Sequence, residues 1–289
     1  MFKSGFVTII GKPNSGKSTL LNRIIGSKVA ITSPKRNTTR NRIRGIYNTD
    51  DYQIIFQDTP GFLKSKSSLD EMMLSRIKES LKGVDVILYL IPFWQTIDEA
   101  YLERVGAIGK GTKKILLLTK VDKADTKEEV LKKLLWAQDQ KIFDSVIPVS
   151  ARKDINIDSL MKEIKESMEE GEAMYDREQI TDMSDNLYVA EIIREKLLFN
   201  LRDEVPHGVF VKVERMELED SKLLIDAEII IDRDSTKGIV IGKGGLMLKK
   251  IGTESRKDLE EYFDEKIFLN LFVKVRKNWQ NKDSIIREV

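Results

Sequence analysis

Residues 11–18 of the chain read GKPNSGKS, and they stand between the apolar run 6–10 and a helix-like stretch at 19–26. The stretch matches the spacing of a phosphate-binding loop at four positions, Gly11, Gly16, Lys17 and Ser18. In such a loop, backbone N–H groups and a helix N-terminus converge on anionic oxygens. We expect Lys17 to reach the terminal phosphates and the Ser18 hydroxyl to ligate Mg²⁺. The stretch therefore predicts a strand, a nucleotide-phosphate loop and a helix, rather than a plain glycine turn.

The composition of the 289 residues limits the chemistry that the protein can perform. Cysteine is absent and there is a single histidine. These counts exclude disulfides, thiol nucleophiles and Cys-ligated zinc, and they argue against a histidine-based triad. Catalysis must then use carboxylates, hydroxyls, lysines, backbone amides or an external metal, which favours phosphate chemistry.

The length and the apolar pattern predict two domains. Through residues 1–170, strand-like apolar runs alternate with amphipathic helical stretches, which indicates an α/β domain with a mostly parallel sheet flanked by helices. The runs lie at residues 5–10, 43–48, 52–57, 84–91, 113–119 and 145–150. We place a charged linker at residues 171–184 and a second domain at residues 185–289.

The second domain has an α+β pattern. Residues 185–202 predict a helix with one apolar side, formed by Leu187, Ala190, Ile193, Leu197 and Leu201. Alternating apolar residues predict three half-buried strands around residues 209–213, 225–231 and 267–275. A glycine turn and a long helix lie between the second and third strands.

The N-terminal apolar stretch is too short for a signal peptide, and no run approaches the roughly 20 apolar residues that cross a bilayer. We therefore expect a cytoplasmic protein.

A second motif, DTPG at residues 58–61, follows the strand at 52–57. Asp58 is expected to hold the metal ion through water, and Gly61 to bring its amide to the terminal phosphate. Three further residues of the first loop, Asn14, Ser15 and Thr19, complete the predicted phosphate-binding set.

Two later motifs point to the base. Asp122 of the sequence TKVD can accept hydrogen bonds from the ring N–H and the exocyclic amine of guanine, a donor pair that adenine lacks. Ala151 of the sequence SAR can offer its amide to the guanine carbonyl. The predicted guanine-binding residues are Thr119, Lys120, Asp122, Ser150 and Ala151. The motifs, in this order and each at a strand end, resemble the GTP-binding signature of translation-factor-related GTPases.

Residues 33–44 contain five basic residues and no acid, and they resemble a first switch loop. Thr39, or else Thr38, would ligate Mg²⁺ when the terminal phosphate is present. The sequence leaves both threonines open.

The stretch Gly242, Lys243, Gly244, Gly245 predicts a GxxG loop, which in KH domains clamps the backbone of about four single-stranded nucleotides. Six basic residues and one acid lie within 237–257, although the chain after residue 170 has 20 basic and 25 acidic residues. This local positive charge marks where RNA would lie, with Lys243, Lys249 and Lys250 as phosphate contacts. Trp279 either stacks on a base or packs in the fold.

Several stretches together closely resemble the bacterial Era GTPase family, namely GKPNSGKSTLLN, PKRNTTR, DTPGF, AEIIREKLL and VIGKGG followed by LKKIG. The resemblance covers essentially the whole chain. It implies a GTPase domain joined to a type II KH domain, with GTP, GDP and Mg²⁺ as ligands. It also implies binding to the 3′ end of 16S ribosomal RNA, a role in 30S subunit maturation, and peripheral membrane association in some relatives.

Departures from the family pattern lie at Ser15, Thr119 and Asp154. Thr119 replaces the usual asparagine of NKxD, and Asp154 replaces a usual glycine, a position that requires a left-handed backbone which aspartate tolerates. Phe62 stands where Ras-like enzymes place a water-orienting glutamine, and GTPases with an apolar residue at this place use a backbone-held water, a monovalent cation or a partner instead. In relatives that use potassium, an asparagine three residues before the loop lysine helps to bind the ion. Asn14 holds that position here, so we hypothesise stimulation by K⁺.

Three other functions stay open at this point. An ATP-using kinase or ATPase would share the phosphate loop but not TKVD and SAR, and a tRNA-modification GTPase would not need the GxxG loop. An RNA-binding scaffold for which hydrolysis is incidental would keep every motif.

Overall fold

The computed structural model describes residues 1–33, 35, 38–60, 67–96, 111–201 and 205–286. The chain divides into two compact units. The first comprises Met1–Ala30, Thr39–Lys64 and Met72–Asp182, and the second comprises Ile31–Thr38, Ser65–Glu71 and Met183–Val289. Two short segments from the first quarter of the sequence therefore pack with the second unit.

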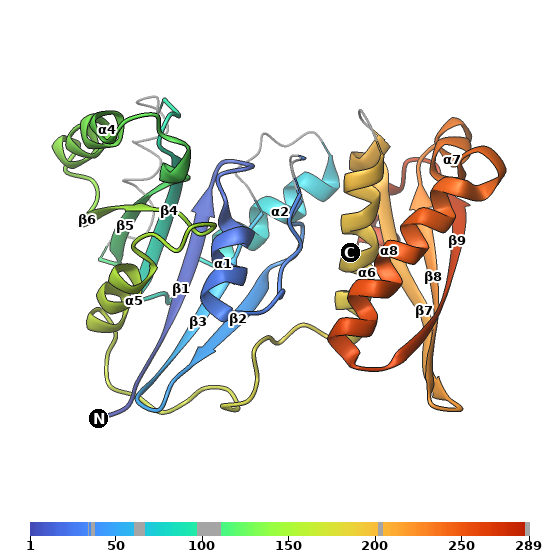
Figure 1. Ribbon diagram of the computed structural model, residues 1–289, viewed down its shortest axis with the longest axis horizontal. Helices are drawn as coiled ribbons and strands as arrows, with labels where there is room; N and C mark the ends of the chain where they lie inside the picture. The colour runs from blue at the N-terminus through green and yellow to red at the C-terminus, as the bar shows by residue number, and fades with distance from the viewer. Residues whose placement is uncertain (34, 36–37, 61–66, 97–110, 202–204, 287–289) are drawn as a thin grey trace. The chain divides into compact units, whose positions relative to one another are not determined.

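The described residues of the first unit form a six-stranded sheet with the order β2-β3-β1-β4-β5-β6 (Figure 1). Its strands are β1 (Lys3–Gly11), β2 (Ile43–Asn48), β3 (Tyr52–Asp58), β4 (Val86–Pro92), β5 (Lys113–Thr119) and β6 (Ser145–Val149). Strand β2 pairs antiparallel with β3, and the other neighbouring pairs are parallel. The predicted, mostly parallel sheet is thus confirmed.

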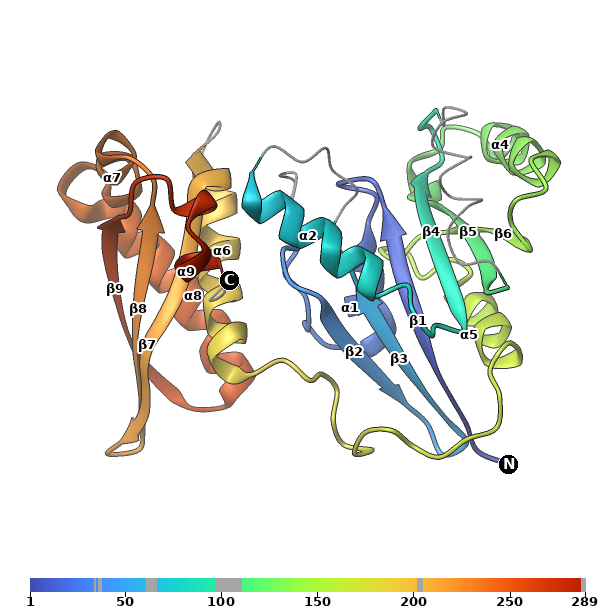
Figure 2. The same ribbon diagram turned by 180° about the vertical axis from the view of Figure 1, so that it is seen from behind.

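Helices cover both faces of this sheet. The helices are α1 (Lys17–Ile25), α2 (Ser68–Glu79), α4 (Lys127–Asp139) and α5 (Ile157–Glu166). Front and back views show α1 and α2 on opposite faces (Figures 1 and 2). Strand β4 is buried along its whole length because both of its faces are covered, which explains why it reads as an unbroken apolar run.

The ends of the parallel strands bring the predicted motifs together. Strand β1 ends at Gly11, β3 at Asp58 and β5 at Thr119, while Ser150 directly follows β6. Parallel strands have their carboxyl ends at one edge of a sheet, which is where open α/β folds bind ligands. The sheet topology thus places four separate motifs at a single edge.

The predicted linker is bonded to the first unit over most of its length. The N–H of Gly171 donates to the carbonyl of Phe2 (3.0 Å), and the hydroxyl of Thr181 donates to the carbonyl of Arg44 (2.7 Å). Between them, the side-chain oxygen of Gln53 accepts the N–H groups of Met174 and Tyr175. The first unit consequently extends to Asp182.

In the second unit, the described residues form a three-stranded sheet with the order β7-β8-β9. The strands are β7 (Val209–Glu219), β8 (Lys222–Ile231) and β9 (Lys266–Val275), and the main helices are α6 (Asp185–Asn200), α7 (Asp234–Ile241) and α8 (Leu246–Phe263). Strand β8 pairs antiparallel with β7 and parallel with β9. Its alternate residues Ile225, Ala227 and Ile229 are buried in the same apolar cluster as residues of α6 and α8. The three predicted strands are present.

Helix α6 differs from the sequence prediction of one apolar side. Its residues from Tyr188 to Glu195 are all buried, so the helix is covered around its circumference. Ile31, which belongs to the second unit, is part of the same apolar cluster as α6. The predicted stripe residues Ala190, Ile193 and Leu197 are buried as expected, but burial extends beyond the stripe, because a segment more than 150 residues away in the sequence also packs on the helix.

Replacing Trp279 by alanine should lower the unfolding free energy of the second unit by about 3–5 kcal/mol. The indole is fully buried, its ring centroid lies 5.7 Å from that of Phe210, and its Nε1 donates to the carbonyl of Gly208 (3.0 Å). This burial shows that Trp279 packs in the fold rather than stacking on a base. Urea unfolding followed by circular dichroism measures the loss, and Trp279→Phe, which keeps an aromatic ring, should lose less. An alanine variant with the wild-type midpoint would contradict this packing role.

Candidate nucleotide-binding site and nucleic-acid interface

The predicted phosphate loop connects the end of β1 to the start of α1. A side chain at residue 11 would place its Cβ 2.6 Å from the carbonyl oxygen of Leu90, so glycine is required there. Gly16 precedes α1 with φ +102°, and it has no side chain with which to cap the helix. Thr19 lies in the first turn, which contains no acid. The N-terminus of α1 is therefore suited to an anion.

Lys17 lies within this loop with only 7 % of its surface exposed. Its Nζ donates to the carbonyl oxygens of Gly11 (3.3 Å) and Lys12 (3.4 Å). Burial lowers the pKa of Lys17, and the nearby Asp58 carboxylate opposes that shift. A polyanion placed beside the ammonium group would favour its charged form.

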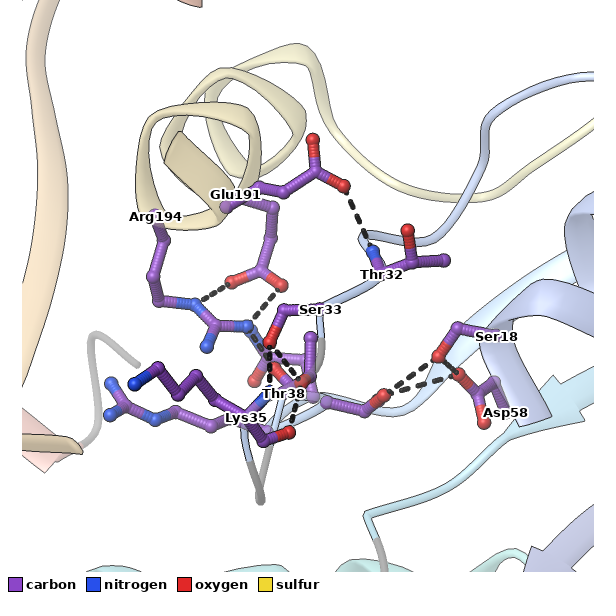
Figure 3. A network of polar contacts seen from close by, with 12 residues as sticks. Ser18, Thr32, Ser33, Lys35, Thr38, Asp58, Glu191 and Arg194 are labelled. Atoms are coloured by element: carbon purple, nitrogen blue, oxygen red, sulfur yellow. Dashed lines mark hydrogen bonds and ion pairs between the residues drawn. The ribbon is translucent and has the colours of Figure 1, made fainter. Parts of the chain in front are cut away.

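The side chains of Ser18, Thr39 and Asp58 lie in contact with one another. Ser18 and Asp58 were predicted to lie together, and Thr39 was one of the two threonines that the sequence left open. Ser18 Oγ donates to Asp58 Oδ2 (2.7 Å), Thr39 Oγ1 donates to the same oxygen (3.2 Å), and the two hydroxyl oxygens are 3.1 Å apart. Figure 3 shows the contact between Ser18 and Asp58. Thr38 has other partners, since its hydroxyl donates to the carbonyl of Lys35 (3.0 Å) and lies 3.0 Å from Ser33 Oγ.

This oxygen cluster fits a magnesium ion. Hydroxyl and carboxylate oxygens are the ligands that Mg²⁺ prefers. Asp58 is completely buried, and its Oδ1 has no hydrogen-bond partner among the described residues. Burial raises the pKa of Asp58, and the charge of Lys17 opposes the shift. A divalent cation would stabilise the ionised carboxylate, and Oδ1 is the atom that could accept a metal-bound water.

Two hydrogen bonds tie the TKVD motif to the phosphate loop. Thr119 Oγ1 donates to the carbonyl of Ser15 (2.7 Å), and Lys120 Nζ donates to the carbonyl of Asn14 (2.6 Å). Both Asn14 and Lys120 have positive φ angles, +63° and +62°. The threonine that replaces the usual asparagine thus holds the loop through its hydroxyl.

Asp122 and Ser150 lie together, as expected of residues around one base. Ser150 Oγ donates to Asp122 Oδ1 (2.6 Å), and the N–H of Lys153 donates to Ser150 Oγ (3.2 Å). Ala151 follows Ser150 at the end of β6. Asp154 has φ +57°, as predicted for its position, and its carboxylate accepts from Arg23 Nε (2.9 Å). Of the predicted nucleotide-site residues, Gly61 lies outside the described residues, as does the neighbouring Phe62.

In the second unit, the GxxG stretch connects α7 to α8. Gly242 has φ +74°, and a Cβ there would lie 2.6 Å from the Cβ of Met247. Gly244 and Gly245 also have positive φ angles. Gly245 directly precedes α8, whose first turn contains no acid. Three of the four residues of this turn are glycines at a helix N-terminus, where a phosphate can approach the backbone closely.

The predicted lysines surround this turn. Lys243, Lys249 and Lys250 are exposed, and Lys250 lies 3.8 Å from Glu254. Two apolar residues beside the turn, Ile239 and Leu246, are also exposed, at 51 % and 68 %. This pair was not predicted from the sequence, although an apolar residue on each side of a GxxG loop is a pattern that indicates contact with bases.

Family models match both parts of the chain. A model described as 50S ribosome-binding GTPase matches residues 6–120, and a model described as KH domain matches residues 204–280.

Characterised relatives match the chain along its whole length. GTPase Era of Caldanaerobacter subterraneus subsp. tengcongensis is 46% identical over 295 residues, which cover 100% of this chain and 97% of the relative. GTPase Era of Clostridioides difficile (strain 630) is 42% identical over 291 residues, which cover 99% and 97%.

Solved structures give the same result, with a TM-score of 0.95 and 38% identity for two of them, each covering 99% of this chain and 98% of the other. One is a variant of Aquifex aeolicus Era bound to GDP·AlF4⁻. The other is Era in complex with MgGDPNP and nucleotides 1506–1542 of 16S ribosomal RNA. These matches confirm the resemblance drawn from the motifs, and the chain belongs to the Era family of GTPases, with a GTPase domain followed by a KH domain.

Proposed function

We propose that this GTPase binds GTP with Mg²⁺ at the edge of its six-stranded sheet and binds the 3′ end of 16S ribosomal RNA through its KH domain during maturation of the 30S subunit. The observation that carries the proposal is the convergence of Ser18, Thr39 and Asp58 beside the buried Lys17. A related Era structure holds MgGDPNP and nucleotides 1506–1542 of 16S ribosomal RNA, which supports both ligands.

In this proposal, the residues of the phosphate loop bind and orient the triphosphate. Lys17 contacts the terminal phosphates, and the N–H groups at the start of α1 bind their oxygens. Ser18 and Thr39 would hold Mg²⁺ directly, and Asp58 would hold it through water. When bound, Mg²⁺ would supply positive charge to the oxygens of the transferring phosphoryl group.

Guanine is selected at the other end of the site. Asp122 accepts the two N–H donors of the base, and its orientation is fixed by Ser150. Thr119 and Lys120 hold the phosphate loop through Ser15 and Asn14, so the position of the base and that of the phosphates are linked.

The attacking water needs a partner that Phe62 cannot provide, because an apolar side chain does not polarise water. We propose that K⁺ supplies the positive charge that assists the attack of this water, with Asn14 as a ligand of the ion. Asn14 is exposed on the loop and has a left-handed backbone, which is compatible with this role.

The KH domain is proposed to bind single-stranded RNA at Gly242–Gly245. Lys243, Lys249 and Lys250 contact the phosphates, and Ile239 and Leu246 contact bases. Because the second domain is acidic overall, this local charge favours specific docking over strong nonspecific affinity.

The protein is proposed to act in the cytoplasm, where ribosomal subunits mature. Among the described residues, no helix has both the length and the apolar character needed to cross a membrane. Peripheral membrane association stays a prediction, as do the domain boundaries at residues 170 and 185.

The first test is GTP hydrolysis in potassium buffer with a single-stranded RNA that matches the 3′ end of 16S ribosomal RNA. We expect the matched RNA to stimulate turnover and a scrambled RNA of the same composition to have no effect.

Replacing Lys243, Lys249 and Lys250 by alanine should weaken RNA binding and reduce its salt dependence by about one unit of slope per lost contact. Hydrolysis indifferent to RNA, without detectable RNA binding, would mean that the role of the second domain is wrong.

Thr39→Ala should weaken Mg²⁺-dependent binding of a GTP analogue by roughly tenfold or more, because it removes a proposed metal ligand. Thr38→Ala is the matched control, and it should stay near wild type because its hydroxyl contacts only Ser33 and Lys35 among the described contacts. Titration with a fluorescent analogue at several Mg²⁺ concentrations measures the difference. If Thr38→Ala showed the larger loss, the assignment of the metal ligand would be reversed.

Asn14→Ala should remove the stimulation of hydrolysis by K⁺ while leaving turnover in Na⁺ at the wild-type level. Initial rates in matched potassium and sodium buffers measure the effect. A variant that keeps the wild-type ratio of the potassium rate to the sodium rate would contradict the role of Asn14.

A further inference from the structure

Helix α6 of the second unit carries three buried charged side chains that the proposed function does not use. Glu191, Arg194 and Glu195 are only 5 %, 2 % and 2 % exposed. They lie next to apolar residues of α6 that form the core of the unit, such as Ile192 and Ile193. Charged groups buried this deeply require specific partners.

Arg194 has two such partners. Its Nε donates to Glu191 Oε1 (2.7 Å), and its Nη2 donates to Glu191 Oε2 (2.6 Å), which makes a bidentate ion pair within the helix. The same Nη2 also donates to the backbone carbonyl oxygen of Thr38. Figure 3 shows the guanidinium group of Arg194 between the carboxylate of Glu191 and Thr38.

A second contact fixes the other end of the same segment. Glu195 Oε1 accepts the backbone N–H of Thr32 (2.9 Å), and Ile31 is buried in the core cluster that contains α6. The segment Ile31–Thr38 is accordingly part of the second unit. Helix α6 thus bonds to the backbone near both ends of the segment Ile31–Thr38, which overlaps the predicted switch loop at residues 33–44.

The next residue in the sequence is the proposed magnesium ligand. The carbonyl oxygen of Thr38 accepts from Arg194, and the same carbonyl group forms the peptide bond to Thr39. The Thr39 hydroxyl meets Ser18 and Asp58. Consecutive Cα atoms are about 3.8 Å apart, so a displacement of one residue moves the next.

Stability alone does not account for this arrangement. Well-packed apolar residues of similar volume are often as stabilising as a buried ion pair, or more so. What the ion pair provides is a rigid, planar donor, since Glu191 fixes the guanidinium plane and leaves Nη2 directed at one carbonyl. The arrangement selects one backbone position for the segment.

We infer that Arg194, oriented by Glu191, is a positioning residue for Thr39: by holding the carbonyl of Thr38, it sets the backbone from which the Thr39 hydroxyl reaches the metal site. The inference rests on the proposed function, because it takes Thr39 as a ligand of the Mg²⁺ that accompanies GTP. By linkage, the Mg²⁺–GTP complex and the contact between α6 and the switch segment then stabilise each other. The first helix of the KH domain thereby influences GTP binding, whereas GDP binding, which does not use Thr39, is insensitive to it.

The test compares two fluorescent nucleotides, GDP and the non-hydrolysable β,γ-imido analogue of GTP, each with Mg²⁺ and with EDTA. In the full-length wild type, Mg²⁺ should raise the affinity for the analogue more than that for GDP. The main variant is Glu191→Met with Arg194→Met, which removes both charges, keeps the volume and avoids leaving one buried charge unpaired. We expect it to lose about tenfold of the Mg²⁺-dependent gain for the analogue and to retain its GDP affinity.

Two further variants separate positioning from folding. Arg194→Lys can still donate to a carbonyl but cannot pair with both oxygens of Glu191, so it should recover part of the loss. Asn200→Ala, at the end of the same helix, removes a hydrogen bond to Glu254 (2.6 Å) without touching Glu191, Arg194 or Glu195, and its ratio of analogue to GDP affinity should stay at the wild-type value. Melting by circular dichroism confirms that each variant is folded.

Hydrogen exchange over residues 31–39 gives a second readout. In the wild type, Mg²⁺ with the analogue should protect these amides more than Mg²⁺ with GDP, and the double variant should lose that difference. A folded double variant that keeps the wild-type gain and protection would overturn the inference and leave the proposed function intact. Equal losses of affinity for GDP and for the analogue would show that Glu191 and Arg194 have only a structural role, which would also overturn the inference. A wild type in which Mg²⁺ gives no preference for the analogue would instead contradict the proposed function.

Discussion

The burial of the Asp58 carboxylate beside the Lys17 ammonium group is the constraint on which the nucleotide site depends. Burial raises the pKa of the acid and lowers that of the base, so each charged form is disfavoured by its surroundings and supported by the other. A bound phosphate would add negative charge beside Lys17, and a metal ion would add positive charge beside Asp58. The site is therefore organised for a ligand that brings anionic oxygens and a cation together, which describes a nucleoside triphosphate with Mg²⁺.

Much of this site could be predicted from the sequence because its residues follow strand ends. Asp58 and Thr119 end buried apolar runs, and the parallel topology brings such positions to one edge of the sheet. The choice between Thr38 and Thr39 could not be predicted, since both are threonines in the same loop and only the tertiary fold brings one of them to Asp58. Gly61 lies outside the described residues, so its role stays a prediction.

The fold was least predictable where segments distant in sequence pack together. Residues 185–202 give the pattern of a helix with one apolar side, yet α6 also packs with Ile31 and bonds to Thr32 and Thr38, and its residues Glu191 and Arg194 are buried. Polar residues in such a helix normally indicate a solvent-exposed face. Here their burial depends on backbone groups of a loop, which leave no trace in an apolar pattern. For the same reason, the sequence did not show that the predicted linker is bonded to the first unit. Its bonds to Gln53 and Arg44 use backbone and side-chain polar groups rather than apolar contacts.

Thr119 shows how a departure from a family pattern can be compensated locally. A shorter hydroxyl side chain replaces an amide, and it donates to the carbonyl of Ser15 while Lys120 donates to that of Asn14. The phosphate loop is thus bonded to the TKVD motif through two of its carbonyls, while its own Lys17 donates to the carbonyls of Gly11 and Lys12. Thr38 and Thr39 place the switch segment under a similar double restraint, since the carbonyl of one residue accepts from Arg194 and the hydroxyl of the next donates to Asp58 at the proposed metal site. Two buried charged groups, the guanidinium of Arg194 and the carboxylate of Asp58, therefore restrain consecutive residues of the chain. Because a peptide bond is short and stiff, a displacement of Thr38 shifts the backbone from which the Thr39 hydroxyl reaches Asp58.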